Sequence, residues 1–299
     1  MDGILIVDKP KNYTSHDIVY KIKKKLNEKV GHTGTLDPMA TGVLPLLIGK
    51  GTLASKYLIN HDKIYEVELE LGKRTDTADV EGNIIEKKEV NKNIFEKENI
   101  ENILKTFLGK QKQTPPIYSA IKVNGKKLYE YARKGQKVEI KQRDIEIYNI
   151  ELIKLNYDEK KIFFKVSCSK GTYIRSLCED IAVKLGNIGY MSNLRRIKVG
   201  EFSISDATEI EKILNDLDEN KEKCISEKFI SLEKLFWKSK DIILNNKATE
   251  LILNGVKITR DLEDGIYKLY KEIENEKETK KFIGIGIIKD NLLKRDIIV

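Results

Sequence analysis

The chain has 299 residues, 34% of them charged, and a net charge of +8 with an isoelectric point near 9.0. These values predict a globular cytoplasmic protein with room for one large domain and one small one, and the basic excess favours a polyanionic partner. They exclude a membrane protein, since no apolar run approaches the ~18 residues that span a bilayer, and the three cysteines fit neither a zinc site nor a disulfide framework.

The first predicted elements are a short strand and a helix. The apolar run over residues 3–8 predicts a buried strand, which Lys9 and Pro10 end. Thr14 then precedes apolar residues at helical spacing, with lysines on the opposite face, which predicts a helix that ends near Leu26. We interpret the lysine face as solvated surface, and the alternative is that these lysines contact an RNA backbone.

Residues 31–44, GHTGTLDPMATGVL, are the most informative segment of the chain. Asp37 is the one acidic residue between Glu28 and Asp62. Loops rich in small residues often carry function, because glycine lets other groups approach closely. The alternative is that Asp37 only caps a helix or closes a turn that begins at Pro38.

The next part of the chain alternates between predicted strands, helices and turns. Strict alternation of apolar and polar residues over 64–71 predicts a strand with one buried face. The other expected elements are a strand over 42–49, a short helix over 52–58, a turn over 76–82, a helix over 96–108 and an extended segment over 113–116.

Residues 121–143 form the most basic stretch, with eight Lys or Arg against two Glu. Tyr118, Tyr129 and Tyr131 lie in or beside it. Cations meet phosphates while aromatic rings stack on bases, so the basic stretch predicts an RNA-binding surface. The alternative is an exposed basic hairpin without a partner.

A predicted hairpin follows, with strands over 145–155 and 161–168, and a turn then leads into a helix over 173–185. Residues 201–234 hold ten Asp or Glu against five Lys, so we interpret them as a helical linker and solvated surface that would repel RNA. The pattern then changes to a helix near 246–254 and short strands through 282–298. This change predicts two domains, over 1–234 and 235–299.

Several of these segments resemble the TruB family of tRNA pseudouridine synthases. Residues 31–44 resemble the active-site motif of the family, and Lys9-Pro10 resembles its opening motif. Further family strings follow in order: KIY at 63–65, RTDTADVEG at 74–82, TPPIYSAIK at 114–122, SKGTYIR at 169–175 and LRR at 194–196. The C-terminal region is the weakest match, and in related proteins it is similar to a PUA domain, a small RNA-binding β-barrel.

The resemblance implies isomerisation of uridine at position 55 in the TΨC arm of tRNA to pseudouridine, without metal or cofactor. The base detaches from the ribose at N1, rotates and reattaches through C5. Asp37 matches the catalytic carboxylate of the family. Two roles are open to it: addition to C1′ of the ribose, or abstraction of a proton from C2′.

Other matched residues are expected to form a pocket for a flipped-out uridine. Arg175 is expected beside Asp37, where it would lower the pKa of the carboxyl and keep it ionised. Tyr65 is expected to stack on the base and Tyr173 to lie near ribose and base. Leu194 is expected to form an apolar wall.

Further RNA contacts are expected outside the pocket. His32 matches a residue that takes the space left by the flipped base and stacks within the T loop. In the family an insertion at the basic stretch clamps the T arm, so Lys126, Lys127 and Arg133 are candidate backbone contacts. Lys9 and the C-terminal domain are further candidates.

The resemblance also implies an α+β fold. A pseudouridine synthase domain over 1–234 would contain a large central mixed, mainly antiparallel sheet flanked by helices, and a small β-rich PUA-like domain would occupy 235–299. The expected protein is a cytoplasmic monomer that binds the T arm of tRNA, without a membrane or an obligatory protein partner.

Three alternatives stand beside this hypothesis. A non-catalytic chaperone of the T arm suits the basic charge equally, although such a binder gains nothing from the Asp37 carboxylate facing phosphates. A synthase that works with guide RNA and partner proteins is disfavoured by the short N-terminus and the long basic stretch. A phosphate-cradling nucleotide enzyme built on Gly31 and Gly34 would lack the Lys-Ser/Thr of a P-loop.

Overall fold

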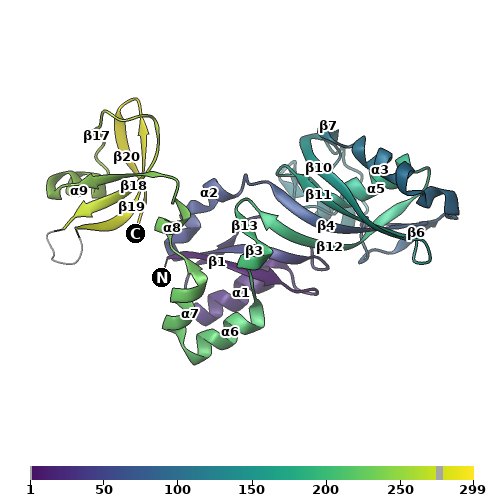
Figure 1. The fold of residues 1–299 in the computed structure, drawn as a ribbon, viewed down its shortest axis with the longest axis horizontal. Coiled ribbons are helices and arrows are strands. Elements are labelled where there is room, and N and C mark those ends of the chain that lie inside the picture. The colour runs from purple at the N-terminus through teal and green to yellow at the C-terminus, as the bar shows by residue number, and fades with distance from the viewer. Residues whose placement is uncertain (1, 274–278) are drawn as a thin grey trace.

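The computed structural model describes residues 2–273 and 279–299. Two sheets organise these residues: an 11-stranded sheet that runs through the body of the molecule, and a five-stranded sheet that forms a lobe of its own near the C-terminus (Figure 1). No helix within the described ranges is long and apolar enough to cross a membrane.

The large sheet has the main strand order β14-β1-β3-β12-β4-β11-β10-β7, with β2, β13 and β15 at its sides. Its pairs are antiparallel except β1 with β14 and β3 with β12, so the expected mixed, mainly antiparallel sheet is confirmed. The strands are β1 (Gly3–Lys9), β2 (Val30–His32), β3 (Thr41–Ile48), β4 (Lys63–Leu71), β7 (Gly109–Gln113), β10 (Arg143–Asn156), β11 (Lys161–Cys168), β12 (Gly189–Val199), β13 (Phe202–Ser203), β14 (Thr208–Glu209) and β15 (Phe229–Ile230).

Helices flank the sheet, and each larger one buries an apolar face against it. α3 and α5 pack on the core around β4, β10 and β11, whereas α1 and α6 pack on β1 and β3. The helices are α1 (Ser15–Leu26), α2 (Ser55–Leu58), α3 (Lys97–Lys105), α4 (Leu128–Arg133), α5 (Ile174–Lys184), α6 (Ile210–Glu219), α7 (Lys221–Lys228), α8 (Leu232–Leu235) and α9 (Asn246–Leu253), with 3-10 turns at Gly49–Ala54, Lys92–Phe95 and Ile204–Asp206.

Local sequence explains the best-predicted elements. The Thr14 hydroxyl accepts the backbone N–H of Asp17, whose carboxylate accepts the N–H of Thr14, and this capping box starts α1. The helix ends at Asn27, which adopts the left-handed conformation with φ 55°. The alternating residues of β4 place Tyr65 and Val67 on the buried face, as predicted.

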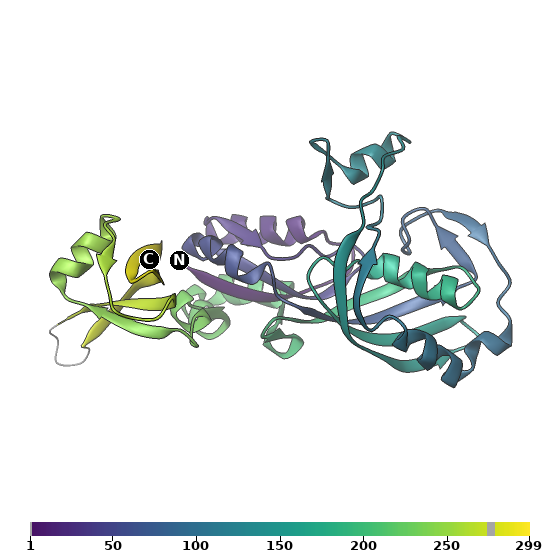
Figure 2. The same cartoon turned by 90° about the horizontal axis from the view of Figure 1, so that it is seen from above.

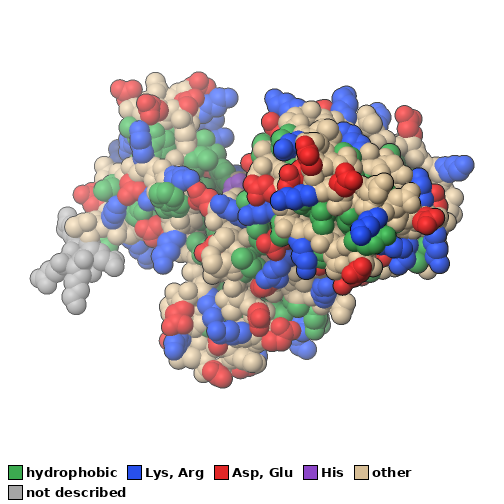
Figure 3. Space-filling view, turned by 45° about the vertical axis from the view of Figure 1, so that its right-hand side comes forward, with side chains coloured by type: hydrophobic (Ala, Val, Ile, Leu, Met, Phe, Trp, Pro, Cys, Tyr) green, Lys and Arg blue, Asp and Glu red, His purple; other side chains and the backbone are tan. Residues whose placement is uncertain are grey.

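The basic stretch projects from the body of the molecule as a small hairpin and helix (Figure 2). It contains β8 (Lys122–Val123), β9 (Lys126–Lys127) and α4. Another short pair, β5 (Lys73–Thr75) with β6 (Ile84–Lys87), follows β4. Acidic and basic side chains interleave on the face seen in Figure 3, so the positive excess is not gathered on that face.

The expected helices within residues 201–234 are confirmed, but the expectation that this segment is a linker and solvated surface is wrong. β14 and β15 both pair with β1, and α6 packs against α1 with Ile210 and Ile213 fully buried. Apolar residues that complete the core lie between the acidic ones. The high density of acidic residues makes this apolar pattern hard to recognise in the sequence. This segment is therefore part of the large domain's architecture.

The C-terminal lobe is rich in strands, as predicted. Its sheet has the order β16-β18-β19-β20-β17, and α9 packs beside it. The strands are β16 (Lys240–Leu244), β17 (Ile258–Thr259), β18 (Gly265–Glu272), β19 (Lys280–Lys289) and β20 (Leu292–Ile298). Ile285 and Ile297 join Ala54, Leu232 and Phe236 in one buried cluster that packs the lobe against the body.

Candidate active site

The loop between β2 and β3 carries Asp37, and hydrogen bonds fix the backbone on both sides of it. The Ser15 hydroxyl accepts the N–H of Leu36 at 2.9 Å. The Lys9 ammonium donates to the carbonyl of Pro38 at 3.2 Å. Because these partners are buried, the loop presents the Asp37 side chain from a rigid support.

Arg196 from β12 fastens the same loop to the centre of the sheet. Its Nη2 donates to the Gly34 carbonyl at 2.9 Å and its Nε to the Val43 carbonyl at 2.8 Å, on opposite sides of Asp37. Gly42, with φ 105°, lies so close to β12 that a Cβ there would be 2.1 Å from the Arg196 carbonyl oxygen. The close approach of β3 to β12 therefore requires glycine at this position.

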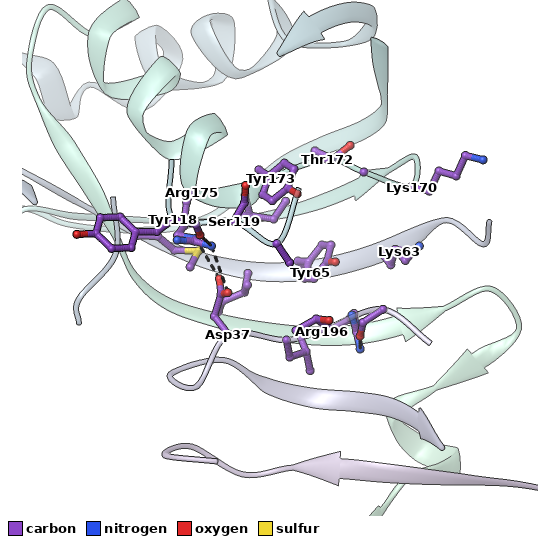
Figure 4. A pocket seen from close by; sticks show the side chains of 18 of the residues that line it. Asp37, Lys63, Tyr65, Tyr118, Ser119, Lys170, Thr172, Tyr173, Arg175 and Arg196 are labelled. Carbon is purple, nitrogen blue, oxygen red and sulfur yellow. Dashed lines mark hydrogen bonds and ion pairs between the residues drawn. The ribbon is translucent and has the colours of Figure 1, made fainter. Parts of the chain in front are cut away.

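Arg175, at the start of α5, binds both oxygens of the Asp37 carboxylate (Figure 4). Its Nε lies 3.0 Å from Oδ2, and its Nη2 donates to Oδ1 at 3.2 Å. Its Nη1 lies 3.5 Å from a second carboxylate, that of Asp79. The side chains of Arg175 and Asp79 are 8% and 4% exposed, whereas that of Asp37 is 32% exposed. Of these three charged side chains, Asp37 is therefore the most accessible to solvent.

Burial dominates the ionisation of the site. It raises the pKa of Asp37 above the ordinary value and Asp79 adds to the rise, whereas Arg175 and Lys9 oppose it. Arg175 lowers the pKa of Asp37 as expected, but burial outweighs the ion pair, so the net shift is upward. Burial also raises the pKa of Tyr65 to about 12, so its phenol stays protonated at neutral pH.

A cavity of about 470 Å³ opens beside Asp37, a size typical of small-ligand sites. Tyr65 from β4, Tyr173 before α5, Arg175 and Leu194 from β12 all line it, so the structure brings together five of the residues chosen from the sequence. Figure 4 shows Tyr65, Tyr173 and Arg175 around the opening. The lining also includes Lys63, Tyr118, Tyr129, Lys170 and Arg196.

The other five chosen residues do not line the cavity, and two of them, Lys9 and His32, lie in the body of the protein. Lys9 is fully buried, and its ammonium donates to the carbonyls of Pro10, Tyr13 and Pro38. The phosphate contact expected of Lys9 is incompatible with this arrangement, because all three of its protons are used inside the protein. His32 lies on β2, and burial lowers the pKa of its ring, which is therefore neutral at neutral pH.

The basic stretch meets the cavity through one aromatic ring. Tyr129 lines the cavity, and its ring lies 5.3 Å from the Lys127 ammonium and 5.4 Å from the Arg133 guanidinium. Lys126 is exposed at the start of β9. The exposed cations are therefore linked to the cavity mouth by a side chain suited to stacking on a base.

Sequence reasoning missed Asp79 and Arg196 as site residues. Both lie inside the strings that carry the family resemblance, at 74–82 and 194–196. The sequence pattern around Asp79 indicates only a turn, and no pattern predicts the strand that holds Arg196. The resemblance of residues 74–82 and 194–196 to family motifs is the signal that could have identified both residues.

Comparison with known proteins agrees with this geometry. Residues 21–174 match the model of the TruB family pseudouridylate synthase N-terminal domain, and residues 175–236 match that of the tRNA pseudouridylate synthase B C-terminal domain. The tRNA pseudouridine synthase B of Clostridium kluyveri is 43% identical over 297 residues, covering 97% of this chain and 96% of the relative. That of Aquifex aeolicus is 40% identical over 296 residues, covering 98% of each.

Solved structures share the fold. The crystal structure of a Cbf5-Nop10-Gar1 complex matches with a TM-score of 0.67 at 24% identity, over 95% of this chain and 78% of that chain. The archaeal box H/ACA sRNP Nop10-Cbf5 complex matches with a TM-score of 0.67 at 22% identity, over 99% and 85%. The fold class expected from the sequence is thus confirmed. The chain belongs to the TruB family and is a pseudouridine synthase.

Proposed function

We propose that the protein converts uridine at position 55 in the TΨC arm of tRNA to pseudouridine, with Asp37 as the catalytic carboxylate. The observation that carries this proposal is the Asp37 side chain, which Arg175 orients through both oxygens and which still faces the cavity. The relatives are named tRNA pseudouridine synthase B, which supports tRNA as the substrate. The protein acts in the cytoplasm as a single chain without a protein partner.

The reaction would proceed on a uridine flipped out of the T loop, which His32 helps to stabilise by stacking there. The base stacks on Tyr65 against the Leu194 wall, and the ribose lies toward Asp37 and Tyr173. Asp37 adds to C1′ or takes the proton from C2′, and the C1′–N1 bond breaks in either case. The base rotates and C5 bonds to C1′, while the Asp37–C1′ bond breaks or, on the other route, C2′ takes its proton back from Asp37. C5 then loses its proton and N1 gains one.

The remaining site residues would hold the rest of the RNA. Lys126, Lys127 and Arg133 contact the phosphate backbone of the T arm, because they are cationic and lie on the segment that projects from the body. Lys127 and Arg133 also adjoin the cavity through the Tyr129 ring. The chain divides into a catalytic domain over 1–234 and a PUA-like RNA-binding domain over 235–299.

Tritium release tests this function. Unmodified tRNA labelled with [5-³H]uridine loses label to water only when C5 gives up its hydrogen. We expect stoichiometric release by the wild-type protein, no release from tRNA with cytidine at position 55, and none by the Asp37→Asn variant at unchanged tRNA affinity. Release by the variant would show that a residue other than Asp37 is the catalytic one. No release by either protein, with tight binding, would support the non-catalytic chaperone.

A further inference from the structure

Two buried cations occupy the side of the cavity opposite the Asp37–Arg175 pair. Lys63 lies two positions before Tyr65 on β4, so both side chains point to the same face of the sheet. Lys63 is 8% exposed, and Arg196 is 1% exposed. Figure 4 shows Lys63 and Arg196 on one side of Tyr65, and Asp37 with Arg175 on the other.

The side chains of Lys63 and Arg196 both lie next to Gly34, which has no side chain of its own. We call this part of the cavity lining the corner. A Cβ at Gly34, where φ is 76°, would lie 3.3 Å from Nη1 of Arg196 and 3.9 Å from Cε of Lys63. Burial, and then the nearby charge of Arg196, lowers the pKa of Lys63. The protein thus holds two like charges side by side in the cavity lining, which costs free energy unless something compensates.

No carboxylate lies within ion-pair distance of either cation in the ranges 2–273 and 279–299. Lys63 donates to the carbonyl of His61, and Arg196 donates to the carbonyls of Gly34 and Val43 and to the Tyr65 hydroxyl, so dipoles solvate both cations. The Asp62 charge also acts on Lys63, but its carboxylate lies beyond ion-pair distance. The neighbouring Arg195 is different, because its Nη2 lies 2.7 Å from the Asp8 carboxylate. The missing counter-charge points to an anion that arrives with the substrate.

The proposed reaction generates such an anion. When the C1′–N1 bond breaks, its electron pair stays with the base, and the charge spreads over N1, O2 and O4 of uracil. A phosphodiester fits this corner less well, since it carries a sugar on each side and these two cations are buried. Lys170, which is exposed and lines the same cavity, is better placed for a phosphate.

We propose that Lys63, supported by Arg196, stabilises the uracil anion while the base is detached from the ribose. This inference rests on the proposed function and holds for either role of Asp37. The Lys63 ammonium donates to a base carbonyl oxygen, and this bond strengthens as the charge develops. The negative charge leaves the base when C5 bonds to C1′, because Asp37 becomes a carboxylate again, either by release from C1′ or by return of the proton to C2′. The later loss of the C5 proton and gain of one at N1 leave the charge unchanged.

Leaving-group chemistry tests the proposal. Lys63→Met removes the charge at similar length, and Lys63→Arg keeps it. Single-turnover rates would be measured with saturating enzyme on tRNA that carries uridine or 5-fluorouridine at the target position. The readout is loss of the N1-linked nucleoside after nuclease digestion, because fluorine blocks proton release at C5.

We expect Lys63→Met to slow the uridine reaction by about 100-fold, as for loss of one oxyanion donor, and Lys63→Arg to restore part of the rate. Fluorine stabilises the departing anion, so the deficit with 5-fluorouridine should be smaller. Lys170→Met is the comparison variant, expected to raise KM and weaken the salt dependence at unchanged kcat.

Three results would overturn the proposal: equal deficits with both substrates, an unchanged single-turnover rate in Lys63→Met, or a Lys63→Met variant that behaves like Lys170→Met. The last would make Lys63 a phosphate contact. These failures differ from failure of the proposed function, which appears as a wild-type protein that forms no pseudouridine. Thermal melting of both Lys63 variants shows whether the fold is retained.

Discussion

Arg175 binds Asp37 through two nitrogens, with Nε 3.0 Å from Oδ2 and Nη2 3.2 Å from Oδ1. The two residues are 138 positions apart, so the loop and α5 must both be in place before the carboxylate is oriented. A guanidinium makes this two-point contact because its donors form a planar fork, whereas a lysine ammonium is a single point charge. The orientation of Asp37 therefore depends on the shape of its partner as well as on its charge.

Replacing Arg175 by Lys should slow catalysis by about 100-fold, because displacement of a reacting group by ~1 Å costs about that much. The measurement is the single-turnover rate with saturating enzyme, and tRNA affinity should change little. Arg195→Lys is a matched control, since Arg195 binds both oxygens of Asp8 and does not line the cavity. An unchanged rate in Arg175→Lys would show that one contact to Asp37 is sufficient.

The pH dependence of kcat/KM should change when the negative charge of Asp79 is removed. Asp37 acts when ionised, and its pKa is raised by burial and by Asp79, so kcat/KM should fall as the pH drops through a value above that of an ordinary Asp. Asp79→Asn removes the negative neighbour, lowers the pKa of Asp37 and moves this acid limb to lower pH. Asp76→Asn, in the same turn, should not move it. An upward shift in Asp79→Asn would contradict the assignment.

Replacing Lys126 and Lys127 together by Ala should raise KM with little change in kcat, because phosphate contacts bind ground state and transition state equally. The slope of log KM against log salt should decrease by roughly 1.5 for two lost contacts. Lys23 and Lys24, two exposed neighbours on α1, provide a matched pair for the control. An unchanged KM at physiological salt would rule out the contact.

Ile213→Ala should lower the free energy of unfolding by about 2–5 kcal/mol, because Ile213 is fully buried between α6 and α1. Urea denaturation followed by circular dichroism measures this difference. Ile153→Ala, at a position that is 56% exposed, should change stability by less than about 0.5 kcal/mol. Near-equal free energies of unfolding for the two variants would indicate that residues 201–234 are a solvated linker.

Elements with a strong local signal could be predicted from the sequence. Thr14 caps α1, and the alternation of β4 follows from having one buried face. Asp37 and Arg175 could be chosen because they lie in the strings that resemble the family, and neither periodicity nor composition would have paired them. The sequence-based choice of Tyr65 likewise depended on its string, since a lone Tyr on a strand is more often a core residue.

Other features depend on contacts that no local pattern encodes. β12 was missed because a central strand that carries a fully buried Arg196 does not look apolar, and the loop carbonyls that solvate it come from β3 and the Asp37 loop. The phosphate contact expected of Lys9 would need an exposed ammonium, which is the usual situation of a lysine. The three carbonyl partners of Lys9 surround the ammonium only after the chain folds and places the loop around Pro38 next to it, so the sequence does not indicate them.

The pairing of β1 has a consequence for folding during synthesis. One edge of β1 pairs with β3, but the other is completed by β14 at Val7 and by β15 at Ile4, after more than two hundred further residues have been added. A nascent chain shorter than about residue 230 therefore carries an apolar strand with one open edge, which invites pairing with other chains. Closure of the sheet combines the first and the last segments of the body, so it is an inherently slow, non-local step, and translation must be nearly finished before it can occur.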